Sequence, residues 1–137
     1  MINYITEIIR HILTLYFGVF VTTAIIGIRN SKKNFLILNC FCILDLLLHM
    51  TCSMLKSSSH VLIAYPLLTH LPLLLLLIFI FKRSLLKSLL AVTTAYLCCQ
   101  INNWISIIPE SLGCAQWIVD LTYIAGIFVT YYVVYRY

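Results

Sequence analysis

Side chains that could do acid–base or ligand chemistry are few in this chain, and three of them lie within long apolar stretches. Asp45 and His49 occupy one stretch, and His70 lies near the middle of the next. At about 100° per residue, Asp45 and His49 share a helical face with Cys42 and Cys52. In antiparallel helices, Asp45 and His70 would lie at similar depths, and pairing would offset the cost of burying both groups.

This face is compatible with three roles. Carboxylate, imidazole and thiol groups can hydrogen-bond helices together, form a proton- or signal-coupled switch, or ligate a zinc ion or a haem. Zinc ligands usually follow C-x-x-C or H-x-x-x-H spacings, which this sequence lacks, and free cysteines also pack as small apolar residues. The pattern therefore favours structural hydrogen bonds or a polar switch at Asp45, His49 and His70, and predicts no metal site.

Two prolines flank His70. Pro66 and Pro72 each lack a backbone N–H, so they are expected to kink or unwind the helix around the imidazole. A broken helix at mid-membrane can mark a ligand or ion site, and a plain kink is the alternative.

The composition indicates what must position these groups. Of 137 residues, 63% are apolar and 9% are charged, whereas soluble chains carry about 25% charged residues. A mean hydropathy of +1.05 excludes a disordered chain, a nucleic-acid partner and a soluble enzyme. The apolar runs are continuous, which favours helices over the alternating strands of a barrel. We predict an all-α membrane bundle of about five helices, at residues 12–28, 35–54, 61–81, 85–108 and 117–135.

The basic residues predict the orientation of the bundle. With the N-terminus outside and the C-terminus cytoplasmic, seven of the nine Lys and Arg residues lie inside. The opposite orientation would place two there. A cleavable signal peptide is the alternative for the first helix, but its apolar run is long for one and no cleavage site precedes the basic loop. The chain is therefore predicted to be a multi-pass protein of the cell membrane.

A polar and aromatic patch is predicted at the outer ends of the last two helices. It is a candidate recognition surface, although an ordinary interfacial helix end would look the same. Cys52 and Cys114 approach this side, but nothing fixes their separation and no disulfide is predicted. The candidate recognition residues are Gln100, Asn102, Asn103, Trp104, Glu110 and Asp120.

Part of the chain resembles the membrane-embedded sensor region of certain bacterial sensor histidine kinases of the GHKL-ATPase type, which have the layout of quorum-sensing receptor kinases. The resemblance covers about 40 of the 137 residues, and its most specific pieces are Thr-His-x-Pro and Tyr-Leu-Cys-Cys-Gln. This sequence reads Asn-Asn-Trp where the family pattern has Pro-Arg-Trp. The residues that carry the resemblance are Tyr65–Pro72, Phe81–Arg83, Thr94–Gln100 and Trp104.

The resemblance implies a homodimer that binds an external or intramembrane signal and drives a cytoplasmic kinase. ATP, magnesium and the response regulator would belong to that kinase part, which should begin where the chain ends at Tyr137, so no cofactor is expected in residues 1–137. The phosphoaccepting histidine of the family lies on a cytoplasmic helix. None of His11, His49, His60 and His70 is therefore expected to take that role.

Residues 1–137 are thus expected to form a single transmembrane sensor domain, truncated before any catalytic domain. The sequence contains no phosphate-binding loop and no H-E-x-x-H motif, so catalysis within these residues is not expected. One alternative is a small membrane transporter, or a transporter subunit, with a proton- or ion-coupled site at Asp45 and His70. Another is a structural membrane subunit that binds no ligand.

Overall fold

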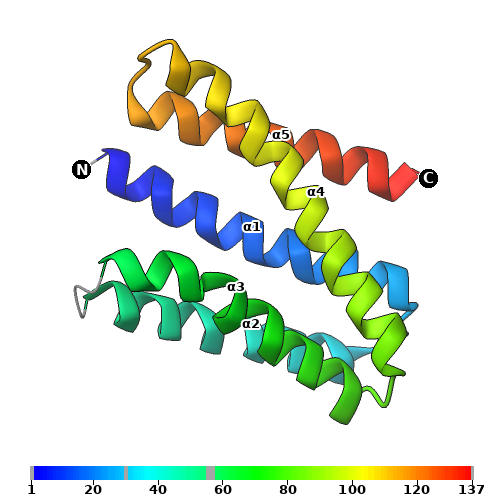
Figure 1. Ribbon diagram of the computed structural model, residues 1–137. Coiled ribbons are helices and arrows are strands. Elements are labelled where there is room, and N and C mark those ends of the chain that lie inside the picture. Colours follow the sequence, from blue (N-terminus) through cyan, green and yellow to red (C-terminus); the bar gives the residue numbers. More distant parts are fainter. Residues whose placement is uncertain (1, 30, 55–57, 137) are drawn as a thin grey trace. The chain divides into compact units, whose positions relative to one another are not determined.

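The computed structural model describes residues 2–29, 31–54 and 58–136, with side chains described for residues 5–29, 31–51 and 68–136. This part of the chain is helical and contains no strand (Figure 1). The helices are α1 (Ile2–Ile26), α2 (Lys32–Met54), α3 (Ser58–Phe79), α4 (Leu85–Ser111) and α5 (Gln116–Arg136).

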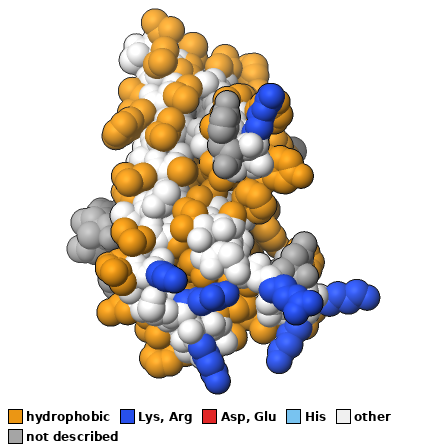
Figure 2. Space-filling view, turned by 90° about the vertical axis from the view of Figure 1, so that its right-hand side faces the viewer, with side chains coloured by type: hydrophobic (Ala, Val, Ile, Leu, Met, Phe, Trp, Pro, Cys, Tyr) orange, Lys and Arg blue, Asp and Glu red, His pale blue; other side chains and the backbone are white. Residues whose placement is uncertain are grey.

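Apolar side chains cover much of the surface in the view of Figure 2. Large residues such as Phe35, Leu86 and Phe128 are exposed, which is unfavourable in water but suits contact with lipid. Four helices are long and apolar enough to cross a membrane, and this confirms the predicted helical membrane bundle. These candidate spans are Ile5–Ile26, Lys32–Thr51, Leu85–Ser111 and Gln116–Arg136.

Two of the helix ends that differ from the sequence prediction have a reason in the structure. Helix α1 begins at Ile2, ten residues before the predicted start at residue 12, because the polar residues Thr6 and Arg10 form contacts within the bundle instead of ending the helix. Helix α4 continues past Pro109, which removes one backbone donor only, and the Leu112 N–H still donates to the Ile108 carbonyl oxygen at 3.3 Å.

The chain divides into two compact units, one formed by Met1–Val21 with Thr93–Tyr137 and the other by Thr22–Val92. The first unit has a core of Phe17, Val21, Ala95, Tyr123 and Ile127, contributed by α1, α4 and α5. The prediction of a single domain stays a prediction.

Helices α1 and α5 run parallel in the first unit. Arg10 contacts Asp120 near the start of both helices, and further along the Phe20 and Tyr131 ring centroids lie 4.8 Å apart. Helix α5 returns beside α4 after the turn at Gly113, whose φ of 70° is the left-handed conformation that glycine adopts easily. Helix α4 is therefore antiparallel to α1.

These directions bear on whether α3 crosses the membrane. Since α1 and α4 run in opposite directions, the chain must enter α4 on the side where it left α1, so α2 and α3 cross together or not at all. In the second unit, Arg83 Nη2 donates to the Gly27 carbonyl oxygen at 3.2 Å, which joins the two turns concerned. Helix α2 is a candidate span, and α3 has 22 residues, or about 33 Å. Within α3, Leu68–Phe79 is a shorter apolar stretch, and the crossing of the membrane by all five helices stays a prediction.

Candidate functional site

Asp120 accepts more side-chain hydrogen bonds than any other carboxylate in the described part of the chain. Arg10 Nη1 donates to Asp120 Oδ1 at 3.0 Å, and Thr6 Oγ1 donates to Oδ2 at 2.9 Å. Gln116 Nε2 lies at a longer 3.4 Å from Oδ1. The Asp120 side chain is 1% exposed, whereas that of Arg10 is 30% exposed. Because both carboxylate oxygens have donors, the cost of burying the charge is largely offset.

Arg10 also joins α1 to two other helices. Its guanidinium carbon lies 4.4 Å from the centroid of the Tyr123 ring on α5, within the range of a cation–π interaction. Its Nη2 lies 3.5 Å from Asn103 Oδ1 on α4, which is a weak hydrogen bond. A single side chain therefore links all three helices of the first unit at one end.

Helical spacing explains why these groups meet. Thr6, Arg10 and Thr14 recur every four residues along α1, so they form one polar stripe on that helix. On α5, Asp120 and Tyr123 lie three residues apart and face this stripe. Thr14 Oγ1 donates to the Arg10 carbonyl oxygen at 2.7 Å and shares a hydrogen bond with Tyr123 Oη at 3.2 Å. The two stripes fix the parallel register of α1 and α5.

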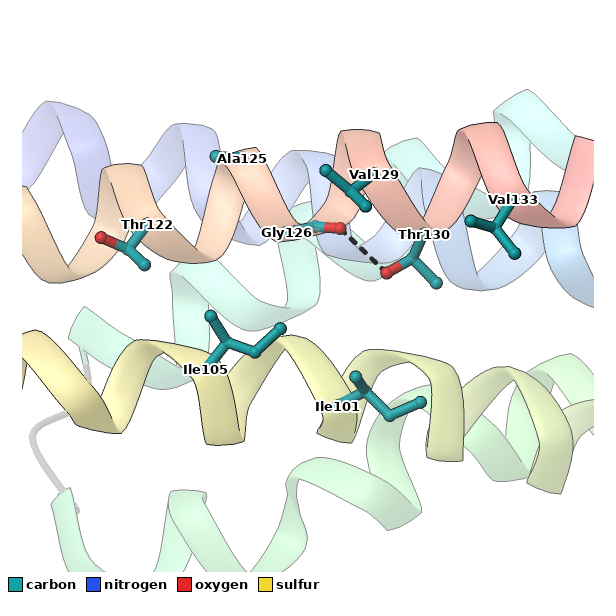
Figure 3. A pocket seen from close by; sticks show the side chains of 8 residues that line it. All are labelled: Ile101, Ile105, Thr122, Ala125, Gly126, Val129, Thr130 and Val133. Atoms are coloured by element: carbon teal, nitrogen blue, oxygen red, sulfur yellow. Dashed lines mark hydrogen bonds between the residues drawn. The ribbon is translucent and has the colours of Figure 1, made fainter.

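A second polar contact joins α4 to α5. Asn102 is fully buried, and Thr130 Oγ1 lies 2.9 Å from both Asn102 Oδ1 and the Gly126 carbonyl oxygen. Figure 3 shows the contact of Thr130 with Gly126. A Cβ atom at Gly126 would lie only 2.8 Å from Asn102 Oδ1. Glycine at this position therefore lets the asparagine side chain pack directly against the α5 backbone, and a larger residue would displace it.

Beside this contact, α4 and α5 frame an open groove of about 430 Å³ (Figure 3). Apart from two threonines and a glycine, its lining is aliphatic, so it offers no group for acid–base or metal chemistry. The residues that line it are Ile101, Ile105, Thr122, Ala125, Gly126, Val129, Thr130 and Val133.

Asp45 lies on α2 in the second unit and is 6% exposed. Its Oδ2 atom has no hydrogen-bond partner among the described residues. His49 and His70 are half-buried. The pairing of Asp45 with His70 stays a prediction.

The metal-site alternative and the bend at the two prolines are the other features that the sequence suggested for this unit. No three His, Cys, Asp or Glu side chains gather into a potential metal site in the part of the chain that was described. Helix α3 stays helical past Pro66 and Pro72, so the helix does not unwind there, and the alternative of a kink stays a prediction. The side chains of Pro66 and Cys52 lie outside those described, and Pro72 is exposed.

The candidate recognition residues do not form one exposed surface. Trp104 and Glu110 are exposed, and Gln100 and Asn103 are half-buried. Asn102 and Asp120 are instead buried in the first unit, because their side chains hold α4 to α5 and α1 to α5.

Sequence reasoning missed Arg10, Thr6, Gly126 and Thr130. Arg10 is one of the two basic residues that the predicted orientation leaves outside. A signal for it existed: it is the one Lys or Arg before Arg29, four residues after Thr6, in a chain whose last span holds one Asp. Comparison with protein-family models, curated proteins and solved structures found no match to this chain.

Proposed function

We propose that this chain is the membrane-embedded sensing part of a receptor, of the kind found in the histidine kinases that it resembles. The observation that carries the proposal is the buried Arg10–Asp120 ion pair, which joins the first and last helices at one end of the bundle. The orientation predicted from the basic residues puts this end outside. The homodimer, the kinase part with its ATP and magnesium, and the response regulator belong to the same proposal.

The ion pair gives a physical route for a signal. A ligand shifts a two-state equilibrium only if it binds the two arrangements with different affinity. A ligand with charged or hydrogen-bonding groups that competes for Arg10 would weaken the α1–α5 contact. Helix α5 has 21 residues and spans about 30 Å, so a change at Asp120 is carried by one rigid helix to Arg136 at the opposite end. Asp45, His49 and His70 are proposed to bias the same equilibrium from within the membrane.

The test is a fusion of this chain, in frame after Tyr137, to the cytoplasmic part of a receptor histidine kinase. Autophosphorylation is then measured in membrane vesicles. We expect Asp120→Asn to change the basal kinase output, because it removes the charge that holds Arg10. Glu110→Gln is the matched control, since Glu110 is an exposed carboxylate near the same end. The proposal would be refuted if the unsubstituted fusion, Asp120→Asn and Glu110→Gln gave equal autophosphorylation while Asp120→Asn was still folded.

A proton- or ion-coupled transporter is the second candidate, and it is favoured by the unpartnered Oδ2 atom of Asp45. A buried carboxylate without a hydrogen-bond donor is costly, and such groups within membrane spans commonly mark a path for protons or ions. Proteoliposomes that contain a pH-sensitive dye would test this under a potassium diffusion potential. Transport predicts a proton flux that is lost in Asp45→Asn and retained in Asp120→Asn. The absence of flux in the unsubstituted chain would exclude proton transport.

A further inference from the structure

Two turns of the second unit carry six basic side chains, and all six are exposed. One turn follows α1 and leads into α2, and the other follows α3 and leads into α4. Together these side chains are called the basic surface. They are Arg29, Lys32, Lys33, Lys82, Arg83 and Lys87.

The two turns are held together by a direct contact. Arg83 Nη2 donates to the Gly27 carbonyl oxygen at 3.2 Å, so the groups from both turns form one surface. Figure 2 shows Lys and Arg side chains gathered along the lower part of one face.

The basic surface has no counter-charge of its own. No ion pair in the described part of the chain includes any of its six residues. Asp45 is the one acidic residue in the sequence from 22 to 92, and it lies thirteen residues after Lys32 on α2, or about 20 Å along the helix. Six cations held this close repel one another, and an external anion would relieve that repulsion.

The backbone adds to the positive potential. Helices α2 and α4 both begin at these turns, and the N-terminal end of a helix carries unpaired N–H donors and a partial positive charge. At the start of α2, Ser31 Oγ accepts from the Asn34 N–H at 3.3 Å, which leaves other donors of that first turn available. Phosphate groups are typical ligands of such helix ends.

Lys82 occupies a backbone conformation that favours glycine. Its φ is 51°, and the matching position after α1 is Gly27 with a φ of 67°. Lysine is disfavoured relative to glycine in this left-handed region, so the sequence keeps a positive charge here against the backbone preference.

Apolar side chains directly border the basic surface. Phe35 and Leu36 are exposed one turn after Lys32, and Phe79 and Leu86 are exposed on either side of Lys82 and Arg83. A molecule with a phosphate head group and hydrocarbon chains could contact the cations and the neighbouring apolar side chains at the same time. A soluble phosphate or a nucleic acid would gain nothing from the apolar rim. We propose that the basic surface binds the phosphate groups of anionic phospholipids.

The test uses the full chain reconstituted in phosphatidylcholine vesicles with trace spin-labelled phosphatidylglycerol or spin-labelled phosphatidylcholine. Electron spin resonance then gives the relative association of each lipid with the protein. We expect a preference for phosphatidylglycerol that falls as salt rises. Each basic residue contributes up to about fivefold near an anionic surface. Lys82→Gln with Arg83→Gln should therefore remove most of the preference.

Two further variants separate binding from folding. Lys82→Gly removes a charge while relieving the backbone, so it should lower the preference without lowering thermal stability. Arg136→Gln, at the exposed end of α5, is the matched control and should lower the preference much less, because Arg136 lies outside the basic surface and contacts Tyr132. Equal association of both lipids with the unsubstituted chain would overturn the proposal. The proposal would also be overturned if Arg136→Gln lost as much of the phosphatidylglycerol preference as the Lys82→Gln/Arg83→Gln variant. Displacement of the lipid by soluble glycerol phosphate would overturn it as well. These outcomes do not depend on whether the chain is a sensor.

Discussion

Substitution of either member of the Arg10–Asp120 pair is expected to destabilise the protein strongly. Breaking a buried ion pair by removing one partner costs about 3–5 kcal/mol. The cost of Asp120→Ala should lie near the lower end of this range, because Arg10 is 30% exposed and keeps its contact with the Tyr123 ring. Arg10→Ala should cost more, because it leaves a carboxylate that is only 1% exposed without its counter-ion. The order of the two single variants therefore follows from their unequal burial.

The measurement is reversible unfolding of the purified protein in mixed micelles by a denaturing detergent, followed by tryptophan fluorescence. The double variant Arg10→Ala/Asp120→Ala should cost less than the sum of the singles, by about 1.5–3 kcal/mol. Arg136→Ala is the control, because Arg136 contacts Tyr132 at an exposed site and should cost less than about 1 kcal/mol. The view that this pair holds α1 to α5 would be refuted if the double variant cost as much as the two single variants together. It would also be refuted if Asp120→Ala lowered the free energy of unfolding no more than Arg136→Ala does.

Four further outcomes are expected. Gly126→Ala should lower the free energy of unfolding by about 1–3 kcal/mol, because its Cβ would lie 2.8 Å from Asn102 Oδ1, and combining it with Asn102→Ala should recover part of the loss. Gly18→Ala, which meets nothing within 4 Å in the middle of α1, should be neutral or stabilising in the same unfolding assay. Asp45→Asn should raise the free energy of unfolding by about 1 kcal/mol, because it removes a buried charge whose Oδ2 lacks a partner, and a lower value would contradict this. A chain with Cys114 as its one cysteine should react with a membrane-impermeant maleimide in intact cells, and labelling after permeabilisation alone would reverse the predicted orientation.

Hydropathy was sufficient to predict the helices but not all of their ends. An apolar run of about 20 residues has no other way to satisfy its backbone in lipid, so the helical class follows from composition. Polar residues near a span end are ambiguous, since they can face water or a partner helix. Thr6 and Arg10 face Asp120, which is why α1 begins before the apolar run does.

The candidate site was harder to predict, because its members are distant in sequence. Arg10 and Asp120 lie 110 positions apart, and nothing local in either helix shows that the first and last helices are neighbours. The depth argument that joined Asp45 to His70 has the same weakness. Equal depth is necessary for contact but does not fix the rotation of each helix about its axis. Rotation depends on packing contacts such as that of Asn102 with Gly126.

The two buried carboxylates lie in different units and differ in their partners. Asp120 has a cation and a hydroxyl donor, so its burial stabilises one helix arrangement and needs no ligand to explain it. Asp45 has an oxygen without a partner, so its burial costs free energy that the described contacts do not return. A group that destabilises the state in which it is buried makes an alternative state more accessible. In a bundle that responds to a signal, Asp120 would therefore define the resting arrangement, and Asp45 would set how readily the bundle leaves it.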